Sequence, residues 1–197
     1  MNGQLIIFEG SDGTGKSHLC EGLVQRLRLS GRTVSPLSFP GRTMGTLGKV
    51  IYDMHHDCSG FGIAAIDATA KQCLHIAAHL DAITGRILPE IASGEIVILD
   101  RYWWSTYVYG IVDGANRPVI NKLIEAEIIA WRDVVPTALF LIDRTSPLRD
   151  EPLEKWHAWR KEYLAVAERE KSRHPIHIIS NDSSSANDAL ETICGLL

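Results

Sequence analysis

A glycine-rich stretch near the start of the chain has the residue types and spacing of a phosphate-binding loop. It fits the pattern G-x-x-x-x-G-K-[S/T], in which glycines let the backbone turn tightly while its N–H groups face a polyphosphate. The lysine of this pattern reaches the β- and γ-phosphates of a nucleoside triphosphate, and the next hydroxyl ligates Mg²⁺. The residues expected to bind the nucleotide are Gly10, Ser11, Asp12, Gly13, Thr14, Gly15, Lys16, Ser17 and His18.

The segments on either side of this loop predict how it is held. Residues 5–8 are apolar and β-prone, as in a buried strand, whereas residues 18–27 have apolar positions at helical spacing. A helix should therefore begin at about Lys16 or Ser17. The order strand, loop, helix places a positive helix end and backbone N–H groups against the phosphates. A chance glycine-rich turn is the alternative, and this context disfavours it.

Two more polar clusters follow strand-like segments. Asp100 closes the apolar run 95–100, where a carboxylate can organise Mg²⁺, although a strand-capping Asp is the alternative. Arg101 comes next in the chain, and Arg42 follows the second strand-like run, residues 33–39. Guanidinium groups bind phosphate bidentately, so two of them beyond the loop lysine predict a second phosphate group. That pattern favours a kinase with a phosphorylated acceptor over a switch GTPase.

Strand-like and helical segments alternate along the whole chain. The alternation predicts an α/β, three-layer P-loop NTPase fold with a central five-stranded parallel sheet. Ligands bind such sheets at the carboxyl ends of the strands, where the three polar clusters would meet. The longest helical region, 64–92, should bend near Thr84 and Gly85. Strands are expected at residues 5–8, 33–39, 95–100, 137–143 and 176–179, with helices at about 16–27, 45–54, 64–92, 118–132, 152–172 and 186–197.

Length and composition narrow the class of protein. The 197 residues show no internal repeat or linker, which predicts one domain over residues 1–197. The net charge of −4 argues against a general nucleic-acid binder. No apolar stretch approaches a membrane span, and the N-terminus has no secretory pattern. The 4 scattered cysteines include no C-x-x-C pair and read as reduced thiols, so we expect a cytoplasmic protein without a membrane or nucleic-acid partner.

Three motifs together resemble the thymidylate kinase family of P-loop nucleoside monophosphate kinases. They are F-E-G-S-D-G-T-G-K-S at residues 8–17, F-P-G-R-T at 39–43 and D-R-Y-W-W-S-T-Y-V-Y at 100–109. The resemblance spans almost the whole chain but weakens after about residue 112. It implies an enzyme that transfers the γ-phosphate of ATP to a deoxynucleoside monophosphate, with dTMP as the leading acceptor. It also implies ATP and Mg²⁺ as cofactors and a homodimeric assembly.

The resemblance implies a role for each matching residue. Asp12 would meet the 3′-hydroxyl of the acceptor sugar, Lys16 would stabilise the transferring phosphoryl group, and Tyr109 could exclude a ribose 2′-hydroxyl. Ser17 and Asp100 would bind Mg²⁺. The expected catalytic residues are Asp12, Lys16, Arg42, Arg101 and Arg149. The expected acceptor-binding residues are Asp12, Phe39, Pro40, Arg42, His75, His79, Arg101, Ser105, Thr106 and Tyr109.

His75 and His79 depart from the family pattern. In the family, these places on the long middle helix hold an aromatic residue that stacks on thymine and an arginine that bonds the base. Histidines four apart share a helix face, yet a histidine cannot reproduce the arginine fork. Either the base is read differently or it is not thymine; a slipped alignment, with ordinary helix histidines, is the alternative. Their spacing also suits zinc, but no zinc motif frames them.

The lid is the second departure. Many relatives have an arginine-rich segment after the fourth strand, and here the corresponding segment, 144–152, is short. Because Gly13 holds a loop position where some relatives place arginine, a lid arginine would be needed. Arg149 is the first candidate and Arg144 the second, with a solvated surface charge as the other reading of each. Two alternatives to a thymidylate kinase stay open: a relative acting on another or modified nucleotide, and a non-catalytic nucleotide-binding module.

Overall fold

A five-stranded sheet forms the centre of the structure, a computed structural model that describes residues 3–183 and 185–197. Its order is β2-β3-β1-β4-β5, and every neighbouring pair is parallel, which confirms the predicted sheet. The strands span Gln4–Glu9 (β1), Val34–Ser38 (β2), Ile96–Asp100 (β3), Ala138–Asp143 (β4) and Ile176–Ser180 (β5).

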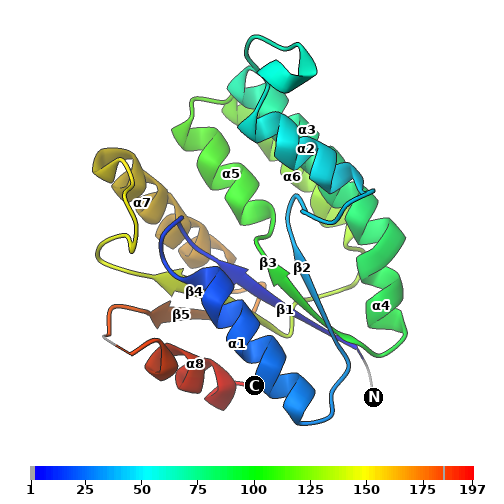
Figure 1. Ribbon diagram of the computed structural model, residues 1–197, viewed down its shortest axis with the longest axis vertical. Helices are drawn as coiled ribbons and strands as arrows, with labels where there is room; N and C mark the ends of the chain where they lie inside the picture. The colour runs from blue at the N-terminus through cyan, green and yellow to red at the C-terminus, as the bar shows by residue number, and fades with distance from the viewer. Residues whose placement is uncertain (1–2, 184) are drawn as a thin grey trace.

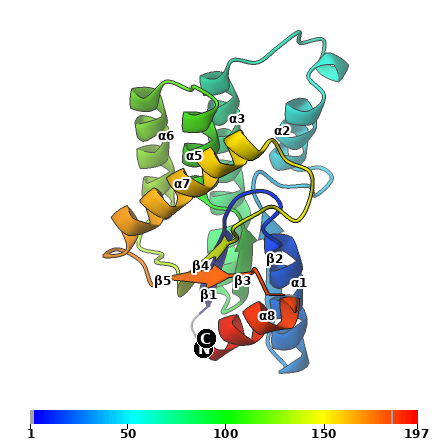
Figure 2. The same cartoon turned by 90° about the vertical axis from the view of Figure 1, so that its left-hand side faces the viewer.

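Helices cover both faces of this sheet (Figures 1 and 2). Helices α1 and α8 pack on one face, and helices α3, α5, α6 and α7 contribute to the core on the other. No described helix combines the length and the apolarity that crossing a membrane requires. The helices are α1 (Lys16–Leu29), α2 (Leu47–His56), α3 (Ala68–Ala82), α4 (Leu88–Ala92), α5 (Trp103–Val112), α6 (Arg117–Ala130), α7 (Leu153–Glu170) and α8 (Ala186–Gly195).

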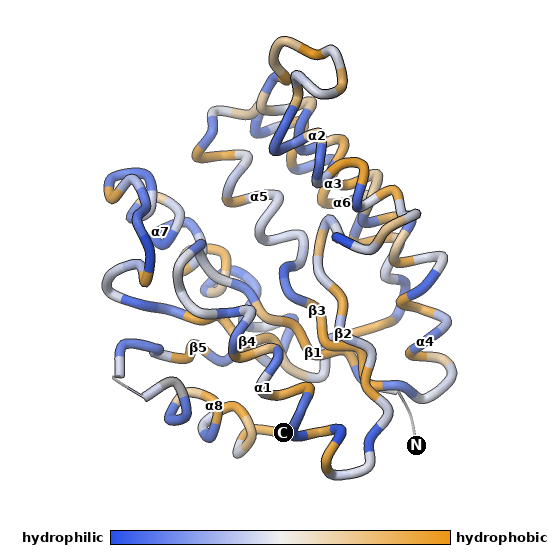
Figure 3. Tube along the Cα trace, viewed as in Figure 1, coloured by the Kyte–Doolittle hydropathy of each residue, from blue (hydrophilic) through white to orange (hydrophobic). Residues whose placement is uncertain are grey.

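The alternation of side chains along β1 divides the core into two halves. Leu5 and Ile7 point to the face covered by α3, α5 and α7, whereas Ile6 and Phe8 point to the face covered by α1 and α8. Both faces are buried, so the central strands are apolar along their length (Figure 3). Burial on both sides fixes the register of the sheet, and with it the position of each strand's carboxyl end.

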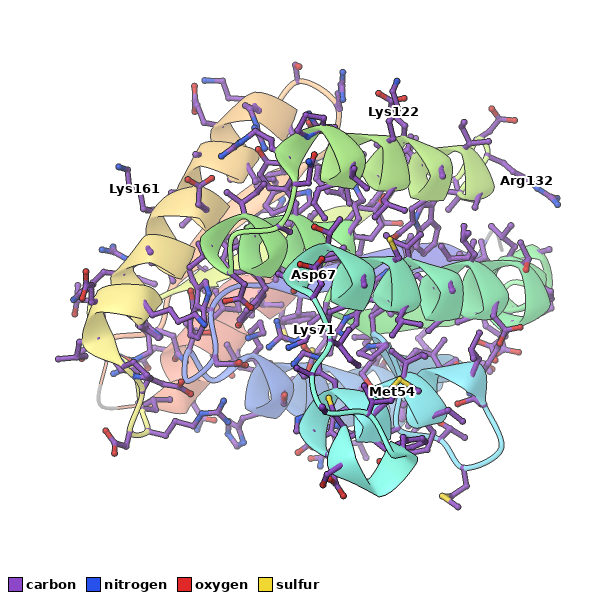
Figure 4. The ribbon with its side chains drawn as sticks, turned by 90° about the horizontal axis from the view of Figure 1, so that it is seen from above. Met54, Asp67, Lys71, Lys122, Arg132 and Lys161 are labelled. Atoms are coloured by element: carbon purple, nitrogen blue, oxygen red, sulfur yellow. The ribbon has the colours of Figure 1, made fainter. Side chains whose placement is uncertain are left out.

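Helices α2, α3 and α6 begin with side-chain caps that the sequence supplies locally. Thr46 accepts a bond from the N–H of Lys49 at the start of α2. Asp67 accepts two backbone N–H bonds at the start of α3, and Asn116 accepts one at the start of α6. In the view from above, α2, α3 and α6 lie side by side, with Lys122 of α6 pointing outward (Figure 4).

The structure differs from the sequence-based expectations in two places. Helix α5 was missed because its sequence is apolar around most of its circumference, and its side chains are buried on several sides. The long helical region begins at Ala68 rather than residue 64, and a π-helical segment, η2 (Ile83–Ile87), lies where the sequence predicts a bend. A single 3₁₀ turn, η1 (Ser59–Phe61), occupies the loop before α3.

Candidate active site

The glycine-rich loop connects β1 directly to α1, and α1 begins at Lys16 as predicted. Gly10, Gly13 and Gly15 all have φ between 75° and 136°, a region that favours glycine. A Cβ atom added at Gly15 would lie 2.6 Å from Nδ2 of Asn181, so this position also lacks space for a side chain. Lys16 donates from Nζ to the carbonyl oxygen of Ser11 at 2.8 Å, which folds the loop around its own lysine.

Residues from the C-terminal half hold the backbone of this loop. Three successive carbonyl groups of the loop each accept a hydrogen bond from a residue more than 130 positions away. Figure 2 shows the segment before α7 lying against the blue loop between β1 and α1. The bonds run from Trp156 Nε1 to Asp12 (2.7 Å), from the Leu148 N–H to Gly13 (2.8 Å) and from Asn181 Nδ2 to Thr14 (2.8 Å).

The lysine at the start of α1 is a buried cation. Only 4% of Lys16 is exposed, and burial together with the nearby charge of Arg101 lowers its pKa to about 8. The carboxylates of Asp100 and Asp12 oppose this shift. A polyphosphate placed in the loop would add negative charge beside Lys16, so the site is arranged to bind an anion.

The start of α1 and the end of β3 meet at a pair of oxygen ligands. The Ser17 hydroxyl donates to Oδ2 of Asp100 at 2.7 Å, and Oδ1 of Asp100 is buried without a hydrogen-bond partner among the described residues. One carboxylate and one hydroxyl suit Mg²⁺, which takes its other ligands from water and phosphates. The described part of the chain holds no group of three or more His, Cys, Asp or Glu side chains arranged for a metal.

Arg101, the residue after β3, lines the cavity. Its backbone has a φ of 78°, an uncommon conformation that turns the chain sharply after β3. Its guanidinium donates to Oδ1 of Asp12 at 2.5 Å and to the Ser105 hydroxyl at 2.9 Å, and it lies 5.1 Å from the centre of the Tyr109 ring. Burial opposes ionisation of Asp12, but the charges of Arg101 and Lys16 outweigh it and lower the pKa of that carboxyl group.

The buried carboxylate of Glu9 bonds the first residues of helix α5, which follow Arg101 in the chain. Glu9, fully buried at the end of β1, accepts bonds from the N–H groups of Tyr102 and Ser105 at 2.7 and 3.0 Å and from the Ser105 hydroxyl at 2.7 Å. It therefore caps the start of α5 from another element. Burial raises the pKa of Glu9, while the charge of Arg101 and these bonds oppose the rise.

The remaining predicted arginines are placed differently from one another. Arg42 is exposed, with its guanidinium 4.8 Å from the centre of the Tyr52 ring. Arg149 places NH2 3.6 Å from Oδ1 of Asp12, whereas Arg144 bonds the carbonyl oxygens of Ser146 and Asn181. Arg149 therefore lies near Asp12 while its Nε bonds Glu151 at 2.5 Å, and Arg144 joins the segment after β4 to the loop after β5.

Four aromatic and imidazole rings, from Phe39, His55, His75 and His79, line one part of the cavity, which we call its ring-lined end. Phe39 stacks on His79 with ring centres 3.9 Å apart and an interplanar angle of 14°. His75 Nε2 lies 2.9 Å from Nδ1 of His55, which bridges α3 and α2. His55 is exposed at its surface, yet the partial loss of hydration and the charge of Lys71 lower its pKa to about 4, and burial lowers the pKa of His75 well below its usual value, so both rings are neutral near pH 7.

One continuous cavity of about 1450 Å³ joins these groups. It exceeds the usual size of a single small-molecule pocket, which leaves room for two nucleotides. The Thr106 hydroxyl lines it and has no hydrogen-bond partner among the described residues. Gly10, Ser11 and Thr14 lie behind its lining. The other predicted site residues line it: Asp12, Gly13, Gly15, Lys16, Ser17, His18, Phe39, Pro40, Arg42, His75, His79, Asp100, Arg101, Ser105, Thr106, Tyr109 and Arg149.

Comparison with known proteins places this site in a family. The family model described as Thymidylate kinase matches residues 8–183. The chain belongs to the thymidylate kinase family. It is 30% identical over 178 residues to a thymidylate kinase of Chlamydia caviae, covering 83% of both chains. It is 32% identical over 155 residues to one of Bifidobacterium longum, covering 78% of this chain and 73% of that one.

A solved structure shares the fold. The crystal structure of thymidylate kinase from Ehrlichia chaffeensis superposes with a TM-score of 0.80 at 23% identity, covering 100% of this chain and 99% of that one. The thymidylate kinase family is one of ATP-dependent phosphotransferases, so this chain is a member of a family of transferases.

Several residues around the cavity escaped prediction from the sequence. Glu9 stands inside the first motif, but nothing in its neighbours indicates that it caps α5. Trp156 and Asn181 hold the loop from elements distant in sequence. His55 also lines the cavity, and only its helical spacing from the other residues of α2 could have suggested this. A fifth residue, Glu127, is buried against His79 and lies outside the cavity lining.

Proposed function

We propose that the protein transfers the γ-phosphate of ATP to a deoxynucleoside monophosphate, with dTMP as the acceptor. The observation that carries this proposal is the single cavity with a phosphate loop at one end, two further arginines across from it and a ring-lined end beyond them. The family supports it, because its members are named for this phosphoryl transfer to thymidylate.

The donor occupies the loop. Backbone N–H groups of the loop and Lys16 bind the β- and γ-phosphates, with Lys16 neutralising charge that develops on the transferring group. Ser17 and Asp100 would hold Mg²⁺, which would supply further positive charge to the donor phosphates. The short lid, residues 144–152, would bring Arg149 to the oxygen atoms of the donor phosphates.

The acceptor occupies the rest of the cavity. Arg101 and Arg42 bind its monophosphate, and Asp12 and Tyr109 meet its sugar. Asp12 and Arg101 already contact each other, so the carboxylate that would orient the sugar lies beside the guanidinium that would hold the phosphate. Phe39, His75, His79, Ser105 and Thr106 surround the base. Rate acceleration comes from positioning and charge neutralisation, with no covalent protein intermediate.

An ADP-release assay tests this function. ATP, Mg²⁺ and the protein are combined with a panel of deoxy- and ribonucleoside monophosphates, and acceptor-dependent ADP is measured. Preference for dTMP over dUMP, dCMP and dGMP supports the proposal. Preference for another nucleotide would replace dTMP as the acceptor, and silence with every acceptor would reject the transfer activity.

We also propose that the chain forms a homodimer. The resemblance to thymidylate kinases motivates this proposal, and the neighbouring apolar side chains of Ile128 and Ile129 near the end of α6 are 41% and 75% exposed. Light scattering coupled to size-exclusion chromatography measures the mass directly. A mass near 21.8 kDa at micromolar concentration would contradict the proposal, because that is the mass of one chain.

A further inference from the structure

A buried ionisable pair lies directly behind the ring-lined end of the cavity. His79 of α3 places Nδ1 2.8 Å from Oε2 of Glu127 on α6, and their side chains are only 2% and 0% exposed. Taking a carboxylate out of water costs several kcal/mol unless a partner compensates it. The buried carboxylate of Glu127 therefore needs a polar partner inside the protein, and His79 is that partner.

The contacts of His79 leave one polar atom for a ligand. Nδ1 is bonded to Glu127, and one face of the ring is stacked on Phe39. The same histidine lines the cavity that contains Arg101 and Lys16. Among the described residues, no hydrogen-bond partner is found for Nε2, the other polar atom of the His79 side chain.

Glu127 determines which of the two ring nitrogen atoms of His79 carries the hydrogen. Its other oxygen, Oε1, faces Nε1 of Trp131 at 3.4 Å, and an indole N–H can only donate. With both oxygens turned toward nitrogen atoms, the carboxylate accepts the Nδ1 hydrogen of His79. A carboxylate that accepts one ring N–H sets the tautomer and the orientation of an imidazole.

We propose that Glu127 is a positioning residue for acceptor recognition: it holds His79 so that Nε2 points at the polar edge of the acceptor's base. This inference rests on the proposed function, because it takes the cavity's occupant to be a nucleoside monophosphate. Glu127 itself touches no ligand. It acts through His79. Together the two residues place one polar atom at the base, as a single longer side chain could do alone.

The competing explanation is purely structural. The pair joins α3 to α6, so it could serve only to pack these two helices. The two roles differ in what they affect. A packing role changes the stability of the fold, whereas a positioning role changes the KM of the acceptor and the choice between bases, with kcat and the KM of ATP kept.

A double-mutant cycle separates the two roles. The variants are Glu127→Gln, which keeps the shape but lets either end of the amide face Nδ1, His79→Phe, which keeps the stack on Phe39, and the double variant. We expect each single variant to raise the KM of dTMP about tenfold and to weaken discrimination between dTMP and dCMP, with kcat within about twofold. The double variant should be no worse than His79→Phe.

Glu170→Gln is the matched control. Glu170 is another buried carboxylate, 8% exposed, but it lies near the end of α7, 3.4 Å from Arg173, and does not line the cavity. Its replacement should leave the KM of dTMP unchanged. Thermal unfolding of all variants shows whether a loss follows from stability.

Two results would overturn the inference. One is a Glu127→Gln variant with a lower melting temperature but the wild-type KM for dTMP and wild-type base preference. The other is additivity, in which the double variant loses as much as both single variants combined. If the wild-type protein forms no ADP with any acceptor, the proposed function is rejected, and the inference with it. The wild-type assay therefore distinguishes failure of the proposed function from failure of the inference alone.

Discussion

At the phosphate end of the cavity, distant side chains and one distant backbone N–H bond the carbonyl groups of the loop between β1 and α1. At the base end, side chains of α2, α3 and α6 bond one another, as in His55 with His75 and His79 with Glu127. Hydrogen bonds to backbone carbonyl groups fix the shape of the loop whatever side chains the loop carries. A bond between two side chains, in contrast, depends on the types of both residues. The phosphate end therefore suits a group common to all nucleotides, and the base end is where selectivity can change.

Lys16→Ala should lower kcat more than any other change proposed here, and this loss should depend least on which acceptor is used. Removing the buried cation takes away the charge that meets the transferring phosphoryl group, so we expect kcat to fall by at least about 10³-fold with every acceptor. Single-turnover ADP formation measures it. Loss with dTMP but not with dUMP would contradict a uniform phosphate end.

Arg101→Ala should have the next largest effect. Loss of its phosphate contact should cost about 2–4 kcal/mol of transition-state stabilisation, or about 30- to 1000-fold in kcat/KM for the acceptor. The KM of ATP should change little. Steady-state kinetics with each acceptor check this, and acceptor kinetics equal to the wild type would show that the monophosphate lies elsewhere.

Affinity for ATP should fall at alkaline pH. The pKa of Lys16 in the free protein is lowered to about 8, so its charge is present below that pH and is lost above it. Since the charged form binds phosphates, the Kd of ATP should rise about tenfold between pH 7 and pH 9. Calorimetric titration across this range measures it, with Lys16→Met as the control whose Kd should stay flat over the same interval.

Trp156→Phe should slow transfer without changing base preference. It keeps a ring in the core but removes the N–H that bonds the Asp12 carbonyl, which should lower kcat about five- to tenfold. Trp104→Phe is the matched control, because Trp104 is as buried and its Nε1 has no partner among the described residues. Equal effects of the two changes would show that loss of packing, rather than of the bond, slows the enzyme.

His55→Ala should have the smallest effect and should act on selectivity alone. It removes the bond to His75 but leaves the phosphate end intact, so kcat with dTMP should stay within about twofold. The ratio of kcat/KM for dTMP and dCMP should shift about two- to threefold. A change in the KM of ATP would mean that the two ends of the cavity are coupled.

Prediction from the sequence worked best where the signal is local. The strand, loop and helix around Lys16 were predicted correctly because one stretch of chain holds the pattern of all three. The central strands β1, β3 and β4 were predicted because each is apolar along most of its length, and β2 and β5 were predicted from shorter β-prone runs. Helix α5 was missed because burial around it removes the amphipathic spacing that identifies a helix. Its first turn depends on Glu9, 93 positions earlier in the chain.

The base end shows the limit of that reasoning. The sequence indicated that His75 and His79 share a helix face, and the structure places both along the cavity. It could not indicate that His79 bonds Glu127, 48 positions away, or that His75 bonds His55 on another helix. Both contacts depend on how α2, α3 and α6 pack against one another.

The sequence by itself determined the sheet, the phosphate loop and the identity of the arginines that follow β2 and β3, because spacing within a few residues is set by the geometry of the chain. The tertiary structure alone decided which side chains hold the loop, which lid arginine faces Asp12 and which atom of His79 is left for a ligand. Those contacts join residues up to 167 positions apart, and only the packing of helices against the sheet brings them within bonding distance.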